Sequence, residues 1–161
     1  MPLRFNLRNL FPQALRFTIG CQGFISLSED RVDFSGRTEK FGIAGRNRGC
    51  CAKFLSSTGE VYAVFGQRDK ALASYREAQS LWKKVAEIEP QRQVEADVSI
   101  GRLCLVQGNL YASSRDGRAE ARMQYQRAID ILSKLKANNQ VVWENLKYVR
   151  EAQQKLQALA G

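Results

Sequence analysis

The side chains that most often carry catalysis or bind metal ions are sparse in this sequence. The chain has no histidine, so general acid–base chemistry would fall to Asp, Glu, Cys, Lys or Tyr. Two pairs of carboxylates lie two positions apart: Glu87 with Glu89, and Glu95 with Asp97. Residues at this spacing do not share a helical face, so we expect them on a solvated surface. We therefore predict no catalytic residues and no enzyme activity.

The four cysteines, at positions 21, 50, 51 and 104, do not form a recognisable site. No two of them have CxxC spacing, and adjacent cysteines such as Cys50 and Cys51 cannot easily bond to each other. Because histidine is absent as well, a zinc site is disfavoured. We expect free thiols in a reducing compartment, no bound metal and no cofactor.

One glycine- and arginine-containing stretch, residues 42–49 (GIAGRNRG), raises the possibility of phosphate binding. It lacks the GK[ST] ending of a phosphate-binding loop, and no strand is predicted directly before it. A flexible basic loop is the preferred interpretation.

The charge distribution keeps a nucleic-acid alternative open. The formal net charge is +9, and residues 1–53 hold nine basic and four acidic residues, which gives +5. Such a balance suits nucleic acid but also occurs in many other proteins. Residues 1–28 contain three arginines and no acid, a composition that resembles an organellar targeting peptide. The uncharged run at residues 17–28 is too short to span a membrane, so we expect a cytoplasmic protein without membrane contact.

Residues 1–50 do not show a stable helical or strand period over a long window. Residues 36–49 hold four glycines and several charges, which disfavour both helix and packed strand. We predict that this basic segment is disordered or loosely structured, with Arg31–Phe34 as one fragment that could form a short strand.

From residue 51 onward apolar residues recur three and four positions apart, as on one face of a helix. We expect helices over residues 51–65, from about Asp69 to Pro90, over 94–113, from about 117 to 137, and over 140–159. Two stripes share the spacing 4, 3, 4 and 3: Ala71, Tyr75, Ala78, Trp82 and Val85, then Ala121, Tyr125, Ala128, Leu132 and Leu135. Leu72, Leu81 and Ile88 widen the first stripe, and the last helix carries Val142, Leu146, Val149, Ala152 and Leu156 on one face.

The expected helix ends coincide with residues that favour such positions. Gly66 suits the left-handed conformation past a helix end, and Asp69 complements the dipole in the next first turn. Pro90 disfavours a helical conformation at Glu89. Asp116 is a candidate N-cap for the helix that follows the turn at residues 113–117.

The helical part contains an internal repeat. The segment TGEVYA at 58–63 matches QGNLYA at 107–112 at an offset of 49, and SYREA at 74–78 matches QYQRA at 124–128 at an offset of 50. Two matches in the same order indicate two related helix pairs, 51–90 and 94–137. A competing register places Gly101 opposite Gly59 and Gly108 opposite Gly66; we prefer the first.

This arrangement resembles the tetratricopeptide repeat (TPR), with a Gly and a Tyr three apart on the first helix and an Ala–aromatic–Ala pattern on the second. The first unit has Gly59, Tyr62, Gly66, Ala71, Tyr75 and Ala78 at these places, and the second has Gly108, Tyr111, Ala121, Tyr125 and Ala128. The unit of about 49 residues is longer than the usual ~34. The chain is also similar to C-terminal TPR arrays of large bacterial proteins, some with serine/threonine kinase domains, but it has no kinase motif.

The resemblance implies an all-α fold at 51–161: helical hairpins in an α-α superhelix, with a capping helix at about 140–159. It also implies a ligand groove lined by outward-facing residues of the first helix of each hairpin. The matching positions are Lys53, Ser56 and Glu60, then Arg102, Leu105 and Asn109. An ordinary solvated or inter-repeat face is the alternative for these residues. The lysine and asparagine of a carboxylate clamp are missing at Ser56 and Glu60, so binding of a chaperone C-terminus is disfavoured.

The sequence therefore favours a protein–protein interaction scaffold or adaptor that binds a protein or peptide partner. Only two and a half repeats are visible, and solenoids normally need about three. We therefore expect that the chain either is the terminal piece of a longer array or covers the exposed face of its first helix with a partner or by self-association with a second copy. The alternative is a basic nucleic-acid-binding protein that uses the Arg-rich N-terminal segment. The aromatic residues could also form a base-stacking platform, but their helical spacing fits core packing better.

Overall fold

The computed structural model describes residues 15–19, 23–28, 31–35, 48–138, 140 and 145–159. The described part from residue 48 onward is helical apart from its turns, as predicted. The α-helices are α1 (Arg48–Val64), α2 (Arg68–Ile88), α3 (Gln93–Ala112), α4 (Arg118–Ala137) and α5 (Leu146–Ala158). Two short 3-10 helices, η3 (Pro90–Arg92) and η4 (Arg115–Gly117), connect α2 with α3 and α3 with α4.

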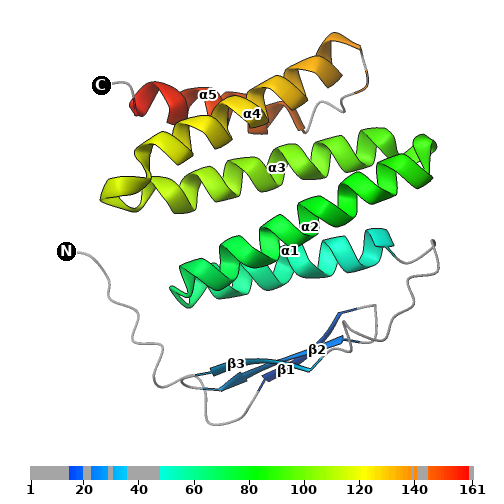
Figure 1. Ribbon diagram of the computed structural model, residues 1–161, viewed down its shortest axis with the longest axis vertical. Coiled ribbons are helices and arrows are strands. Elements are labelled where there is room, and N and C mark those ends of the chain that lie inside the picture. Colours follow the sequence, from blue (N-terminus) through cyan, green and yellow to red (C-terminus); the bar gives the residue numbers. More distant parts are fainter. Residues whose placement is uncertain are drawn as a thin grey trace.

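The helices stack in chain order (Figure 1). Helix α1 packs along α2 and α3 packs along α4, which makes two hairpins, and α2 joins them by packing on α3. Helix α5 then covers α4. One apolar core runs through all five helices, from Ala52 on α1 to Ala152 on α5.

The first predicted stripe and the first three residues of the second lie in this core, whereas Leu132 and Leu135 form a second buried cluster with Val149. Every residue of both stripes is buried, with exposed fractions from 0% for Ala71 to 5% for Leu135. Burying such side chains stabilises the fold by roughly 1.5–3 kcal/mol each for the large apolar ones. Leu72 is buried as predicted, but Ile88 is 53% exposed because α2 ends there and no helix covers its last residue.

The turn between α1 and α2 is the one that Gly66 predicts. Gly66 has φ +69°, which a residue without Cβ adopts at little cost. The amide of Gln67 donates to the carbonyl of Tyr62 at 2.8 Å, and the amide of Gly66 donates to that of Ala63 at 3.1 Å. This is the Schellman pattern, which satisfies carbonyls that the helix end leaves free. Asp69 lies in the first turn of α2, as expected.

The connection at Pro90 agrees with the prediction, and the later ones differ in detail. Glu89 has a non-helical backbone (φ −123°, ψ 74°), and Pro90 begins the 3-10 helix η3 at a first position where its missing N–H costs no hydrogen bond. Asp116 does not cap α4: it lies within η4, and Gly117 occupies the N-cap position without a side-chain hydrogen bond. The last helix begins at Leu146, later than expected, and the predicted core residue Val142 lies outside the described residues.

The N-terminal part contains a three-stranded antiparallel sheet, where the sequence predicted at most one strand. The strands β1 (Leu15–Ile19), β2 (Gly23–Ser28) and β3 (Arg31–Ser35) pair in the order β1-β2-β3. The predicted fragment Arg31–Phe34 is thus confirmed as a strand. The register sets Phe17 opposite Ile25, and Ile25 opposite Phe34.

The alternating strand period was not recognised in the sequence because each strand is only five or six residues long. The segments LRFTI, ISLS and RVDFS each alternate apolar and polar residues, and the intervening turns interrupt the alternation in a longer window. The glycine-containing stretch at 42–47 lies outside the described residues.

None of the helices that the structure describes combines the length and the apolar character needed to cross a bilayer.

Candidate functional site

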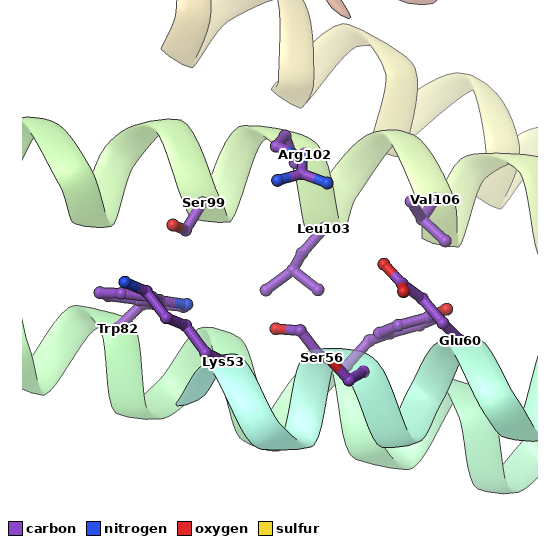
Figure 2. A pocket seen from close by; sticks show the side chains of 10 residues that line it. Lys53, Ser56, Glu60, Trp82, Ser99, Arg102, Leu103 and Val106 are labelled. Carbon is purple, nitrogen blue, oxygen red and sulfur yellow. The ribbon is translucent and has the colours of Figure 1, made fainter. Parts of the chain in front are cut away.

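A groove of about 320 Å³ lies between α1 and α3, over α2 (Figure 2). Helices α1 and α3 supply its walls and α2 supplies its floor. The lining residues are Lys53, Ser56, Ser57 and Glu60 on α1, Ser99, Arg102, Leu103 and Val106 on α3, and Tyr75 and Trp82 on α2. On each wall they follow the spacing i, i+3, i+4 and i+7 of one helical face.

Four of the six groove candidates predicted from the sequence meet in this groove: Lys53, Ser56, Glu60 and Arg102. The other two lie elsewhere. Leu105 is 3% exposed and belongs to the core, so its prediction as an outward-facing residue is wrong. Asn109 accepts a hydrogen bond from the Tyr125 hydroxyl on α4 at 2.8 Å.

The difference arises because α3 is an interior helix with neighbours on two sides. Its face toward α1 carries Ser99 and Leu103, which the sequence analysis did not single out, whereas Asn109 contacts α4. Transferring positions from α1 to α3 by the repeat alone does not tell whether a residue of α3 faces α1 or α4. The i, i+3, i+4, i+7 pattern that starts at Ser99 is the signal that would have found the second wall.

A glycine on the first helix of each hairpin lets the second helix of the same hairpin approach closely. A Cβ at Gly59 would overlap the Tyr75 ring, and a Cβ at Gly108 would lie 2.5 Å from a ring carbon of Tyr125. The two glycine–tyrosine pairs occupy matching places, which supports the preferred register of the repeat. Gly108 lies within α3, whereas Gly66 lies past the end of α1, so the competing register is wrong.

The hydroxyls of the two tyrosines differ. The Tyr125 hydroxyl donates to Asn109, but the Tyr75 hydroxyl is buried and has no hydrogen-bond partner in the described part of the chain. In the first repeat unit, Glu60 occupies the position that matches Asn109 in the second. Burial, and secondarily the negative charge of Glu60, raise the pKa of the Tyr75 phenol, so it stays protonated and remains a donor.

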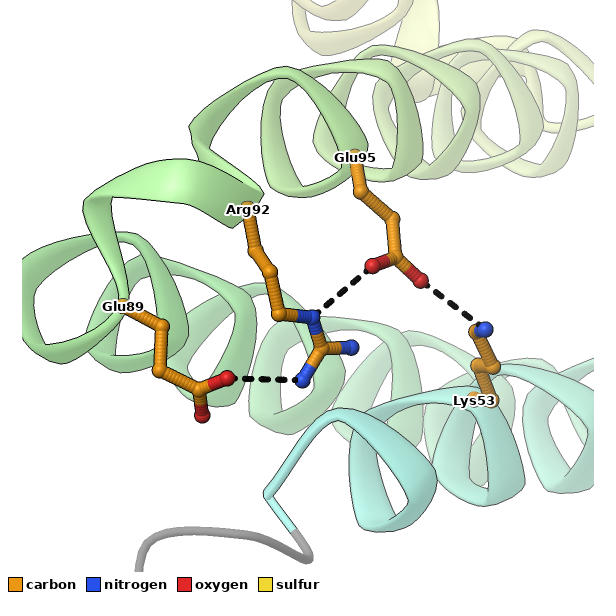
Figure 3. Close-up of polar contacts among 4 residues, drawn as sticks. All are labelled: Lys53, Glu89, Arg92 and Glu95. Carbon is orange, nitrogen blue, oxygen red and sulfur yellow. Dashed lines mark hydrogen bonds and ion pairs between the residues drawn. The ribbon is translucent and has the colours of Figure 1, made fainter.

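A charge network connects Lys53, which lines the groove, with three residues at the junction of α2 and α3 (Figure 3). Arg92 of η3 binds Glu95 at 2.9 Å and Glu89 at 3.3 Å, and Lys53 of α1 binds the other oxygen of Glu95 at 2.9 Å. The Lys53 ammonium and the Arg92 guanidinium each lie 5.9 Å from the centre of the Trp82 ring. The network thus ties the first hairpin to the start of the second.

Hydrogen bonding from Arg92 is the main cause that lowers the pKa of Glu95, and Lys53 adds to it. Glu95 is therefore ionised at neutral pH. Lys53 already has a carboxylate partner, which reduces its capacity to attract another anion.

The remaining two charges of the groove have no ion-pair partner among the described residues. Arg102 on α3 lies 5.0 Å from the centre of the Tyr148 ring, but no described carboxylate pairs with it. Glu60 on α1 likewise has no described cation within ion-pair distance. With respect to the described residues, the groove therefore presents one guanidinium and one carboxylate without an ion-pair partner on opposite walls.

The described residues contain no cluster of His, Cys, Asp or Glu that could hold a metal ion. Cys104 is fully buried, and burial raises the pKa of its thiol. The groove presents hydroxyls, charges of both signs and the apolar side chains of Leu103 and Val106.

The described helices define an all-helical stack of two antiparallel hairpins and one further helix, with a groove along the first helices of the hairpins. No family model, no curated protein and no solved structure matches the chain.

Proposed function

We propose that this protein is a TPR-like adaptor that binds a peptide segment of a partner protein in the groove between α1 and α3. The observation that carries the proposal is the convergence of Lys53, Ser56, Glu60 and Arg102 on one groove. These residues come from matching helices of the two hairpins, as a peptide-binding TPR surface would require.

The repeated hairpin geometry supports the TPR-like part of the proposal. The pairs Gly59–Tyr75 and Gly108–Tyr125 have matching close contacts, and both tyrosines are 1% exposed. Small residues at such places let two helices approach closely, and neighbouring hairpins then bury a shared core.

The composition of the groove supports binding of a peptide rather than catalysis. A groove of about 320 Å³ accommodates a few side chains, with apolar area at Leu103 and Val106 and hydroxyls at Ser56, Ser57 and Ser99. Sites that bind ligands combine apolar lining with a few polar groups in this way.

Selection of random displayed peptides against the full chain tests the proposal. Ser99→Trp places a large ring into the groove, and Ser80→Trp places the same ring on an exposed position of α2 as a matched control. We expect peptides that bind the unchanged chain and Ser80→Trp but not Ser99→Trp. Equal binding to all three proteins would contradict a groove-based function, provided that all three melt at similar temperatures.

The nucleic-acid alternative predicts a different outcome. Binding through phosphates would give affinity for generic RNA that falls steeply with salt. Such binding would also be unaffected by Ser99→Trp. The net charge of +9 is the observation that motivates this measurement of RNA binding.

A further inference from the structure

We infer that the groove binds an extended peptide with an acidic and a basic side chain about two positions apart, the acid on Arg102 and the base on Glu60. This inference rests on the proposed function and specifies the chemistry of the partner. It combines three observations: the unpaired charges, the buried Tyr75 hydroxyl and the apolar side chains between them.

The charges are the first observation. The Arg102 guanidinium lies over the Tyr148 ring, a contact that uses none of its N–H donors in an ion pair, so they can bind a carboxylate. Glu60 is exposed on the opposite wall and is free to pair with an ammonium or guanidinium group. A ligand with both charge signs therefore complements this groove better than a purely acidic or purely basic one.

The spacing of the two charges follows from the helices. Figure 2 shows Arg102 across from Ser56, with Glu60 one turn further along α1. One helical turn advances about 5.4 Å, which corresponds to about two residues of an extended chain. Side chains two apart in an extended peptide also point to the same side.

The Tyr75 hydroxyl favours an extended rather than a helical ligand. Tyr75 lines the groove, and although the residue is only 1% exposed, its hydroxyl donor has no partner among the described residues. A peptide in an extended conformation has backbone carbonyls free to accept such a bond, whereas a helix uses its own carbonyls internally. Val106, which is half-buried, offers apolar contact to a neighbouring side chain, whereas Leu103 lines the groove but is only 5% exposed.

The other parts of the stack do not offer a second copy of this site. In the second unit Asn109 accepts the bond from Tyr125, and Leu105 is buried. Lys53 is paired with Glu95 and so contributes less to an acidic ligand than Arg102 does. One peptide per chain is the expected stoichiometry.

Four short synthetic peptides of equal length and apolar content test the inference by fluorescence anisotropy with the full chain. One has Glu and Lys two positions apart, one has only Glu, one has only Lys, and one is uncharged. We expect the Glu–Lys peptide to bind about threefold more tightly than each singly charged one, because exposed ion pairs contribute modestly. Tyr75→Phe should weaken its binding about threefold or more through the lost hydrogen bond.

Charge reversal gives the decisive comparison. Glu60→Lys should change the preference to the Glu-only peptide, and Arg102→Glu should change it to the Lys-only peptide. Glu77→Lys and Lys84→Glu, two exposed positions of α2 outside the groove, are matched controls that should leave the order unchanged.

The outcomes separate the inference from the proposed function. If all four peptides bind equally well and Ser99→Trp abolishes their binding, the proposed charge pattern is wrong and the adaptor function still stands. Unchanged affinity in Tyr75→Phe would overturn the backbone contact. Failure of every peptide to bind, or binding that ignores Ser99→Trp, would count against both.

Discussion

The ring of Tyr75 on α2 lies so close to Gly59 on α1 that a single added Cβ would overlap it. Tyr125 on α4 and Gly108 on α3 repeat this relationship in the second hairpin. The two contacts set the distance between the helices of each hairpin, and several consequences for stability follow from them.

Replacing either glycine by alanine should destabilise the protein. Alanine alone would favour a helix by about 0.5–1 kcal/mol, but overpacking against a buried ring costs about 1–3 kcal/mol. We expect a net loss of about 1–2 kcal/mol in the free energy of unfolding for Gly59→Ala and for Gly108→Ala, measured by urea denaturation. Ser80→Ala, on the exposed side of α2, should change stability by less than about 0.5 kcal/mol. If either variant is as stable as the unchanged chain, the tyrosine ring can move away from the added methyl group, which would contradict the prediction.

Removing the two tyrosine hydroxyls should have unequal effects. Tyr125→Phe removes the bond to Asn109 and should cost about 0.5–1.5 kcal/mol. Tyr75→Phe removes a buried hydroxyl without a partner and should leave stability unchanged or raise it. Thermal melting of the two variants side by side checks this contrast, and a larger loss for Tyr75→Phe would contradict it.

The network at the α2–α3 junction should make stability depend on pH. The pKa of Glu95 is lowered in the folded chain, mainly by its hydrogen bond with Arg92. The stabilisation is therefore complete above the usual glutamate pKa and disappears as pH falls through the lower folded value. Glu95→Gln should be less stable at neutral pH, and the difference should shrink below about pH 4.5.

The size of this effect is limited by solvent. The Glu95 side chain is 38% exposed, so we expect a difference of at most about 1 kcal/mol at neutral pH. High salt at neutral pH should reduce it as well. Urea midpoints over a series of pH values measure both effects, and a difference that grows toward low pH would refute the assignment.

The described cysteines should differ in reactivity toward iodoacetamide. Cys50 is exposed, whereas Cys51 is half-buried and burial raises the pKa of its thiol. Cys104 is fully buried, with a pKa raised by burial. Because the thiolate is the reactive form, Cys50 should react first and Cys104 only after unfolding. Mass-spectrometric mapping of labelled peptides checks the order, and rapid labelling of Cys104 in the folded chain would contradict it.

Much of the helical fold could be predicted from the sequence because the signals are local. The stripe from Ala71 to Val85 reads directly as one helical face, and all five of its predicted members are buried. Gly66 marks the end of α1 because the positive φ that ends the helix is a local property of this one residue, which glycine adopts at little cost. The strands were largely missed because their alternation lasts only five or six residues between turns.

The sequence by itself determined the buried stripes of α2 and α4, the end of α1 at Gly66 and the matching positions of Gly59 and Gly108, since each depends on local spacing along the chain. Only the tertiary structure decided which residues line the groove: it added Ser99 and Leu103, assigned Asn109 to a bond with Tyr125 and placed Leu105 in the core. The physical reason is that a helix has several faces with the same period. Which face meets α1 depends on how α2 packs on α3, a contact between distant parts of the chain.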